Sequence, residues 1–190
     1  MKTAIILHGM PLKDEYYDDE APSPSNHHWL PWVQKQLLLK NILAQTLELP
    51  KPYEPVYEEW AKVFNQLKVD DETILIGHSC GAGFLVRWLS ENKVRSGKVA
   101  LVAPFLDPEN EIKSEFFNNF EIDSKLKERT GGISIFYSVD DWGKIITSVN
   151  QIRDSIPGIE LKEFLDRGHF ITVDNIKADT FPELLKWLLE

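Results

Sequence analysis

Thr73-Ile-Leu-Ile-Gly-His-Ser-Cys-Gly-Ala-Gly-Phe-Leu85 decides the fold, because this stretch passes from a short apolar run through closely spaced glycines into a helix-forming segment. Its centre, Gly77 to Gly81, matches the pattern G-x-S-x-G in the strand, turn and helix setting that makes the pattern specific. A strand that reverses sharply into a helix strains the backbone of its central serine and leaves room only for very small neighbours. The pattern predicts that Ser79 is a nucleophile at the positive end of a helix. The alternative, an ordinary serine-capped turn, is disfavoured by the flanking strand and helix.

Six β-prone runs alternate with helical segments along the chain. They are Thr3–Leu7, Ala44–Leu49, Thr73–Ile76, Lys98–Val102, Ile133–Tyr137 and Ile159–Phe164. Several are almost continuously apolar, which is typical of strands buried on both faces of a sheet. This order predicts an α/β fold, a three-layer α/β/α sandwich with a mostly parallel central sheet, formed by residues 1–190 as one domain.

Helical periodicity is clearest in three places. Apolar residues spaced by three and four predict a helix from about His27 to Asn41, with Asn26 as its N-cap and Pro31 in its first turn. Similar spacing predicts helices just after Gly81 and at the end of the chain, from about Phe181.

Two stretches break the alternation of strands and helices. Pro11–Ser25 holds three prolines and a run of acidic residues, and we expect a long polar loop there. Leu106–Lys127 mixes charged residues with phenylalanines, and we expect a short helical excursion near the site. We expect its phenylalanines to cover the core rather than to form a surface that binds a protein partner.

The composition excludes several classes of function. Apolar residues make up 43% and charged residues 27% of the 190 residues, as in a globular protein. The net charge of −9 repels nucleic acid and anionic membranes. The single cysteine, Cys80, cannot form an internal disulfide or a cysteine-based metal site. The apolar run Ala4–Leu7 is too short for a signal peptide, and no run approaches the roughly 20 residues of a membrane span. We expect a soluble, cytoplasmic protein without a cofactor.

A serine nucleophile needs a base, and five histidines are available. His169 follows the last β-prone run in Asp166-Arg-Gly-His-Phe170, at the end of the order serine, aspartate, histidine that α/β-hydrolases follow. We therefore expect His169 to be the general base, rather than a surface loop histidine. The other four histidines are assigned packing or loop roles.

The imidazole needs a carboxylate to fix its proton, and Asp140 and Asp141 both follow the run Ile133–Tyr137. Adjacent residues that leave a strand point in different directions, so that only one can face His169. The other is expected to cap the helix that begins near Gly143 or Lys144. The residues alone leave the choice open, and a solvated turn is the third alternative.

Two backbone N–H groups must face the carbonyl oxygen on which negative charge develops. The amide of Cys80, directly after the nucleophile, is expected to supply one of them. The second is expected from Met10, in the loop after the first strand, where Gly9 allows the backbone to approach. An ordinary turn after the strand is the alternative.

Taken together, these residues resemble the small lidless serine hydrolases of the retinoblastoma-binding protein 9 and YdeN family, within the α/β-hydrolase superfamily. The likeness is carried by His8-Gly9, Asn26-His27-His28-Trp29-Leu30-Pro31-Trp32, Gly77-His78-Ser79-Cys80-Gly81, Ser138-Val-Asp-Asp141 and Gly168-His169-Phe170, and it covers nearly the whole chain. It implies an α/β-hydrolase fold without a large cap domain, with Asp141 as the acid beside Ser79 and His169. The chain departs from the family where Trp142-Gly-Lys-Ile follows the acid, in place of a proline-containing run, and in the long acidic segment Pro11–Ser25.

These inferences predict a carboxylesterase-like serine hydrolase. It would cleave a small ester, thioester or amide of an acyl substrate through Ser79, His169 and Asp141 and an acyl-enzyme intermediate, and the resemblance also implies peptidase activity in some relatives. The alternative is a protein-interaction module that keeps the fold with little or no catalysis, and its protein partner is unspecified. A metal enzyme, suggested only by His27-His28, is disfavoured because adjacent residues do not share a helix face. The sequence names no substrate-binding residues.

Overall fold

A parallel sheet forms the centre of the protein. The structure is a computed structural model that describes residues 2–172 and 178–190. Within these ranges six strands pair in parallel in the spatial order β2-β1-β3-β4-β5-β6. The strands are β1 (Thr3–Leu7), β2 (Leu43–Leu47), β3 (Thr73–His78), β4 (Val99–Val102), β5 (Ile133–Ser138) and β6 (Glu160–Phe164). Each predicted β-prone run overlaps one of them, and the predicted parallel α/β sheet is confirmed.

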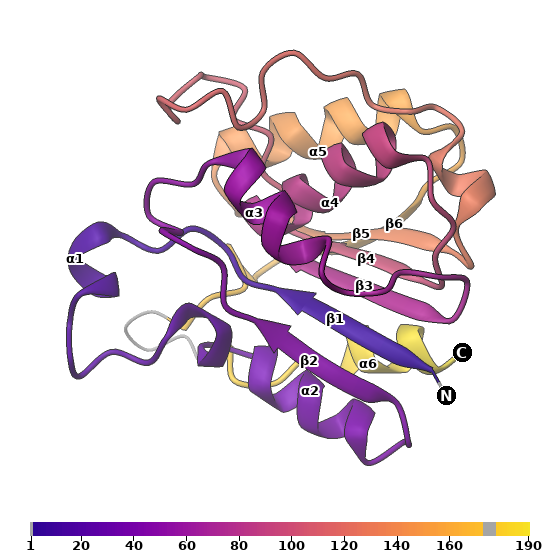
Figure 1. The fold of residues 1–190 in the computed structure, drawn as a ribbon, viewed down its shortest axis with the longest axis horizontal. Helices are drawn as coiled ribbons and strands as arrows, with labels where there is room; N and C mark the ends of the chain where they lie inside the picture. The colour runs from indigo at the N-terminus through magenta and orange to yellow at the C-terminus, as the bar shows by residue number, and fades with distance from the viewer. Residues whose placement is uncertain (1, 173–177) are drawn as a thin grey trace.

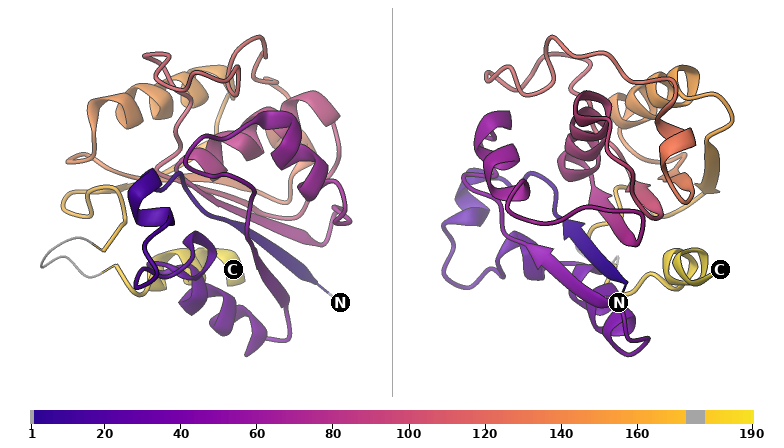
Figure 2. Two further views of the ribbon diagram at one scale, coloured as in Figure 1. Left: turned by 60° about the vertical axis from the view of Figure 1, so that its left-hand side comes forward. Right: turned by 45° about the vertical axis from the view of Figure 1, so that its right-hand side comes forward.

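Helices cover both faces of this sheet. They are α1 (Lys13–Tyr16), α2 (Leu30–Leu38), α3 (Tyr57–Phe64), α4 (Cys80–Asn92), α5 (Gly143–Ser155) and α6 (Pro182–Leu189). Figures 1 and 2 show α3, α4 and α5 on one face, α2 and α6 on the other, and α1 beyond the carboxyl ends of the strands. The described residues thus form the expected α/β/α sandwich, without a large cap domain. None of their helices is long and apolar enough to cross a membrane.

The pattern of burial explains why the strands in the middle of the sheet have the most apolar sequences. Every residue of β3 is buried, because helices cover both of its faces and a strand lies on each side. The helix α4 packs against β3 and is buried from Cys80 to Ser90. By contrast β6 lies at the edge and carries charged residues such as Glu160 and Lys162, which discourage pairing with another chain.

The predicted helix from His27 to Asn41 is shorter at both ends than expected. It spans Leu30–Leu38, Trp29 is its N-cap, and Pro31 lies in its first turn as predicted. The prediction of Asn26 as the N-cap is wrong, since Asn26 ends a 3₁₀ helix. His28 has a φ of 55°, which a right-handed helix cannot contain, and this forces the later start.

The segment Pro11–Ser25 is more structured than the predicted polar loop. It contains the short helix α1 and the start of a 3₁₀ helix, and it packs through its tyrosines. The hydroxyl of Tyr17 lies 2.7 Å from that of Tyr53, and the rings of Tyr16, Tyr17 and Tyr53 contact one another. The segment therefore forms a defined wall at the carboxyl edge of the sheet (Figure 1).

The predicted helical excursion in Leu106–Lys127 is wrong. The segment forms turns, and only a 3₁₀ helix begins at Leu126. Side chains replace helical hydrogen bonds: the carboxylate of Asp107 accepts the N–H groups of Glu111 and Ile112. The ring of Phe116 is fully buried, in agreement with the prediction of an aromatic lid on the core.

Candidate active site

The turn between β3 and α4 presents Ser79 in a strained conformation. Its φ of 52° and ψ of −119° lie outside the regions that L-residues favour, as the glycine pattern predicted. A Cβ atom at Gly77 would lie 2.6 Å from the backbone of Ala82, and one at Gly81 would lie 2.4 Å from the carbonyl oxygen of His8. Only glycine fits at either position.

The structure brings Ser79, His169 and Asp141 together from three separate segments. His169 Nε2 lies 2.9 Å from Ser79 Oγ, and its Nδ1 lies 3.0 and 3.1 Å from the two carboxylate oxygens of Asp141. The imidazole tautomer with a proton on Nδ1 satisfies both contacts, because Nδ1–H then donates to Asp141 and Nε2 accepts from the hydroxyl. The Asp141 side chain is fully buried and that of His169 nearly so.

The two adjacent aspartates point in different directions, as the sequence predicted, and only Asp141 faces His169. Asp140 does not cap a helix. The carboxylate of Asp140 accepts the hydroxyl of Ser138 at 2.5 Å and the N–H of Gly168 at 2.9 Å. These hydrogen bonds, the first above all, lower the pKa of Asp140. The prediction of a cap is wrong, because α5 begins at Gly143 with Trp142 as its N-cap. Asp140 instead tethers the loop that carries His169.

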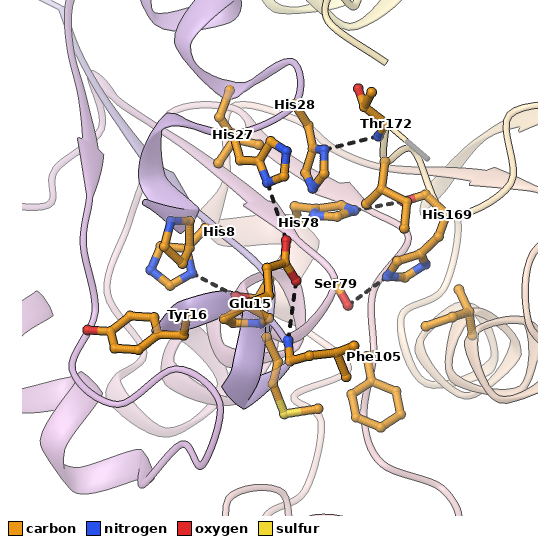
Figure 3. A pocket seen from close by; sticks show the side chains of 18 of the residues that line it. His8, Glu15, Tyr16, His27, His28, His78, Ser79, Phe105, His169 and Thr172 are labelled. Atoms are coloured by element: carbon orange, nitrogen blue, oxygen red, sulfur yellow. Dashed lines mark hydrogen bonds and ion pairs between the residues drawn. The ribbon is translucent and has the colours of Figure 1, made fainter. Parts of the chain in front are cut away.

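Two further histidines support that loop. The Nε2–H of His78 donates to the carbonyl oxygen of His169 at 2.8 Å, and His28 Nδ1 accepts the N–H of Thr172 at 3.0 Å (Figure 3). Burial, the largest cause, lowers the pKa of His28 to about 4 and that of His78 well below its usual value. Both rings are neutral at pH 7 and serve as fixed hydrogen-bond partners. This role is a more specific form of the packing role that the sequence indicated.

The fourth histidine, His8, orients the peptide group between Gly9 and Met10. Its Nδ1–H donates to the Gly9 carbonyl oxygen at 2.7 Å, while its Nε2 accepts the N–H of Leu49 at 3.1 Å. The C=O and N–H of a trans peptide point in opposite directions, so that holding the Gly9 carbonyl fixes where the Met10 N–H points. A Cβ at Gly9 would lie 3.0 Å from the Cβ of Ser79, so that a side chain there would be tightly crowded.

Cys80 occupies the first position of α4, where a backbone N–H has no partner within the helix. Its side chain is fully buried, and burial raises the pKa of the thiol. The thiol is therefore an inert core group, and only the backbone amide of Cys80 can act at the site.

A pocket of about 470 Å³ opens onto Ser79. Its walls come from the loop after β1, from α1, from the segment before α2, and from the loops that carry Trp142 and His169. Figure 3 labels Tyr16 of α1, His28 before α2 and His169 in these walls. The lining is mostly apolar, and a volume of this size suits a small organic ligand. Several of the lining residues belong to the motifs that the sequence analysis singled out, but it assigned none of them to substrate binding.

The fifth histidine, His27, stacks on His28 with ring centroids 3.7 Å apart. In the described ranges no group of three or more histidine, cysteine or acidic side chains is arranged to hold a metal ion.

Comparison with known proteins relates the chain to a family of enzymes. Residues 21–170 match the family model described as serine hydrolase. The chain is 29% identical over 153 residues to YdeN of Bacillus subtilis (strain 168) and 29% identical over 151 residues to the serine hydrolase RBBP9 of Rattus norvegicus. Each alignment covers 77% of this chain and 80% of the relative. The crystal structure of the ydeN gene product from B. subtilis matches with a TM-score of 0.79 and 24% identity, over 100% of this chain and 97% of that one.

Proposed function

This chain belongs to the serine hydrolase family, and we propose that it cleaves small carboxylic esters through Ser79, His169 and Asp141. The observation that carries the proposal is the continuous series of contacts from the Ser79 hydroxyl through the imidazole to a fully buried carboxylate. A serine hydroxyl becomes a nucleophile when a base takes its proton, and this arrangement provides the base and orients it.

In the first half of the reaction, His169 Nε2 takes the hydroxyl proton while Ser79 Oγ attacks the carbonyl carbon of the ester. The carbonyl oxygen becomes an oxyanion, which the backbone N–H groups of Cys80 and Met10 stabilise. The C–O bond to the alcohol then breaks, and the imidazolium gives its proton to the leaving alcohol. The acyl group remains on Ser79. Asp141 stabilises the imidazolium from the time it takes the serine proton until it gives that proton to the alcohol.

In the second half, His169 takes a proton from water, and the resulting hydroxide attacks the acyl carbon. The bond from that carbon to Ser79 Oγ breaks, and the proton on Nε2 returns to Oγ. The products are one carboxylic acid and one alcohol, and the enzyme is restored. A thioester or an amide would follow the same steps with a thiol or an amine as the leaving group.

The decisive experiment is labelling by a fluorophosphonate probe, together with hydrolysis of 4-nitrophenyl acetate. We expect the wild-type protein to be labelled and active, and Ser79→Ala to lose both properties while it keeps its melting temperature. Ser155→Ala, at the far end of α5, is the matched control and should behave like the wild type. Labelling that persists in Ser79→Ala would identify another nucleophile. A folded wild-type protein that is neither labelled nor active would favour a protein-interaction module.

Substrate size is tested with 4-nitrophenyl esters of increasing chain length. The pocket volume of about 470 Å³ favours short and medium acyl chains. We expect kcat/KM to fall from hexanoate to palmitate. A clear preference for palmitate would exclude the small-ester proposal while leaving the serine mechanism in place.

A further inference from the structure

One acidic side chain lies in the pocket, and the reaction steps above give it no role. Among the described residues that line the pocket, Glu15 is the only acidic one. It projects from α1, in the long acidic segment that departs from the family pattern. Figure 3 shows its carboxylate directed toward the imidazole of His27 rather than away from the pocket. Its side chain is 41% exposed, and a ligand in the pocket can therefore reach it.

The protein itself uses little of the hydrogen-bonding capacity of this carboxylate. Glu15 Oε2 accepts the N–H of Leu12 at 3.4 Å, which is a long hydrogen bond. Glu15 Oε1 lies 3.6 Å from His27 Nδ1, and an imidazole neutralises a carboxylate only when it is protonated. A carboxylate can accept about four hydrogen bonds, so that most of its capacity remains open to a ligand.

The other charged residue in the lining, Lys144, is already neutralised. Its ammonium group binds the carboxylate of Glu111 at 2.5 Å, and Glu111 lies outside the pocket lining. The unmatched charge of the pocket is therefore negative. An anionic substrate would be repelled by Glu15, whereas a cationic substrate would provide this carboxylate with a positively charged partner.

We propose that Glu15 is a substrate-binding residue that receives a primary ammonium group on the ester. The inference rests on the proposed function, since the ester would be the one attacked by Ser79. The ligand class is an ester whose acyl or alcohol chain ends in a protonated amine. The apolar lining would hold the methylene chain, and three N–H donors would face a carboxylate with open acceptor positions.

The test compares esters of equal shape and different charge at about pH 8, where an alkylamine is protonated. On the acyl side, 4-nitrophenyl 6-aminohexanoate is paired with the heptanoate and with the singly charged adipate monoester. A second pair, the 8-aminooctanoate and the nonanoate, places the amine two methylene groups farther from the ester. On the alcohol side, the acetate of 6-aminohexan-1-ol is paired with heptyl acetate. We expect kcat/KM for the amine to exceed that of its neutral partner roughly three- to ten-fold in at least one pair at low salt, with the adipate ester the poorest acyl substrate.

Glu15→Gln should reduce this ratio to about one. Glu20→Gln is the matched control, because it removes the same charge from an exposed position in the same acidic segment, outside the pocket lining. It should leave the ratio unchanged. Equal loss in both variants would assign the preference to the overall field of the protein and overturn the proposal. A ratio near one in every wild-type pair, or a ratio that survives Glu15→Gln, would also overturn it.

Failure of the amine preference and failure of the proposed function remain separable. Hydrolysis of the neutral esters and fluorophosphonate labelling report on Ser79 without any contribution from an ammonium group. If both persist while the amine and neutral esters have equal kcat/KM, the serine hydrolase proposal is retained and the role of Glu15 is rejected. If both are absent, the reaction itself is wrong.

Discussion

The indole of Trp142 lies stacked on the imidazole of His169, with ring centroids 4.4 Å apart and the ring planes inclined by 26°. The backbone N–H of Trp142 also donates to Asp141 Oδ1 at 2.7 Å. Trp142 thus contacts both His169 and Asp141, although 53% of its surface is exposed. The stacking limits rotation of the imidazole, and the face of the indole would attract the imidazolium of the proposed reaction.

We therefore expect Trp142→Ala to lower kcat/KM for 4-nitrophenyl acetate roughly two- to thirty-fold, which corresponds to the usual strength of a cation–π contact. Trp142→Phe should retain more activity than Trp142→Ala, because it keeps a ring face over His169. Leu39→Ala, which removes an exposed apolar side chain just after α2, is the control and should leave the rate unchanged. An alanine variant as fast as the wild type would show that the stack is only a surface contact.

The adjacent aspartates allow a direct test of which carboxylate acts as the acid. Asp141→Asn places an amide against His169 Nδ1, which favours the imidazole tautomer that cannot accept the serine proton. We expect kcat to fall roughly 10³- to 10⁴-fold. Asp140→Asn should keep most of the activity, because its amide oxygen can still accept the N–H of Gly168. Steady-state kinetics on the two variants decide the matter, and the opposite order would make Asp140 the acid.

We expect Asp140 to contribute to the stability of the fold, in a way that depends on pH. Its pKa in the folded protein is lowered, chiefly by the hydroxyl of Ser138. A lowered folded pKa stabilises the protein above the unfolded value of 3.8, and this stability is lost as the pH falls through the folded pKa. The melting temperature of Asp140→Asn should lie below that of the wild type at pH 7, and the difference should begin to narrow below about pH 4. A gap that stays constant down to pH 3 would contradict this assignment.

His8 offers a way to test how the Met10 amide is positioned. An asparagine amide can replace the Nδ1–H donor to the Gly9 carbonyl, whereas a glutamine can reach the position of Nε2, beside the N–H of Leu49. If the fixed Gly9 carbonyl orients the oxyanion donor, His8→Asn should retain more kcat than His8→Gln, whereas KM should differ little. A loss of roughly ten-fold or more is expected in the glutamine variant.

The melting temperatures of the two His8 variants provide the control. Each variant leaves one buried backbone group without its partner, so both should be destabilised. Rates that follow stability and not the identity of the retained hydrogen bond would assign His8 a purely structural role.

The features that sequence reasoning predicted well are encoded by neighbouring residues. The turn at Ser79 follows from two glycines and a buried strand within a few positions of one another, and the six strands follow from continuous apolar runs. The pairing of His169 with Ser79 follows from chain order, because parallel strands bring their carboxyl ends to one edge. The choice of Asp141 over Asp140 required a family resemblance, since both positions carry the same chemical group.

The features that sequence reasoning missed depend on contacts between distant segments of the chain. Glu15 lies in a segment whose tyrosines pack against Tyr53, and nothing within Pro11–Ser25 indicates that contact. The stack of Trp142 on His169 is likewise set by where two loops meet. In Leu106–Lys127 a mixture of charged residues and phenylalanines led to the expectation of a helix, but anchoring to α4 determines the backbone path. Local propensity is a weak guide wherever such anchors exist.

Arg87 is one of the residues that anchor this segment to α4. From within α4 its guanidinium donates to the carbonyl oxygens of Glu115 and Phe116 at 3.0 and 2.6 Å, and to the Glu91 carboxylate at 2.9 Å. It also lies over the ring of Tyr57, 3.7 Å from the ring centroid. Loss of this nearly buried cation would leave the carbonyl oxygens of Glu115 and Phe116 without their guanidinium donor and would remove one of the partners of the Glu91 carboxylate.

We expect Arg87→Met to lower the free energy of unfolding by roughly 2–4 kcal/mol and to expose the segment around Phe116 to proteolysis before the rest of the chain unfolds. Arg95→Met is the matched control, because Arg95 pairs with Asp71 at the surface, where both side chains are about two-thirds exposed. It should cost less than about 1 kcal/mol. Urea unfolding and limited trypsin digestion measure the two effects. If the two variants are equally stable, the buried guanidinium does not hold this segment, and the packing of Phe116 alone must fix its path.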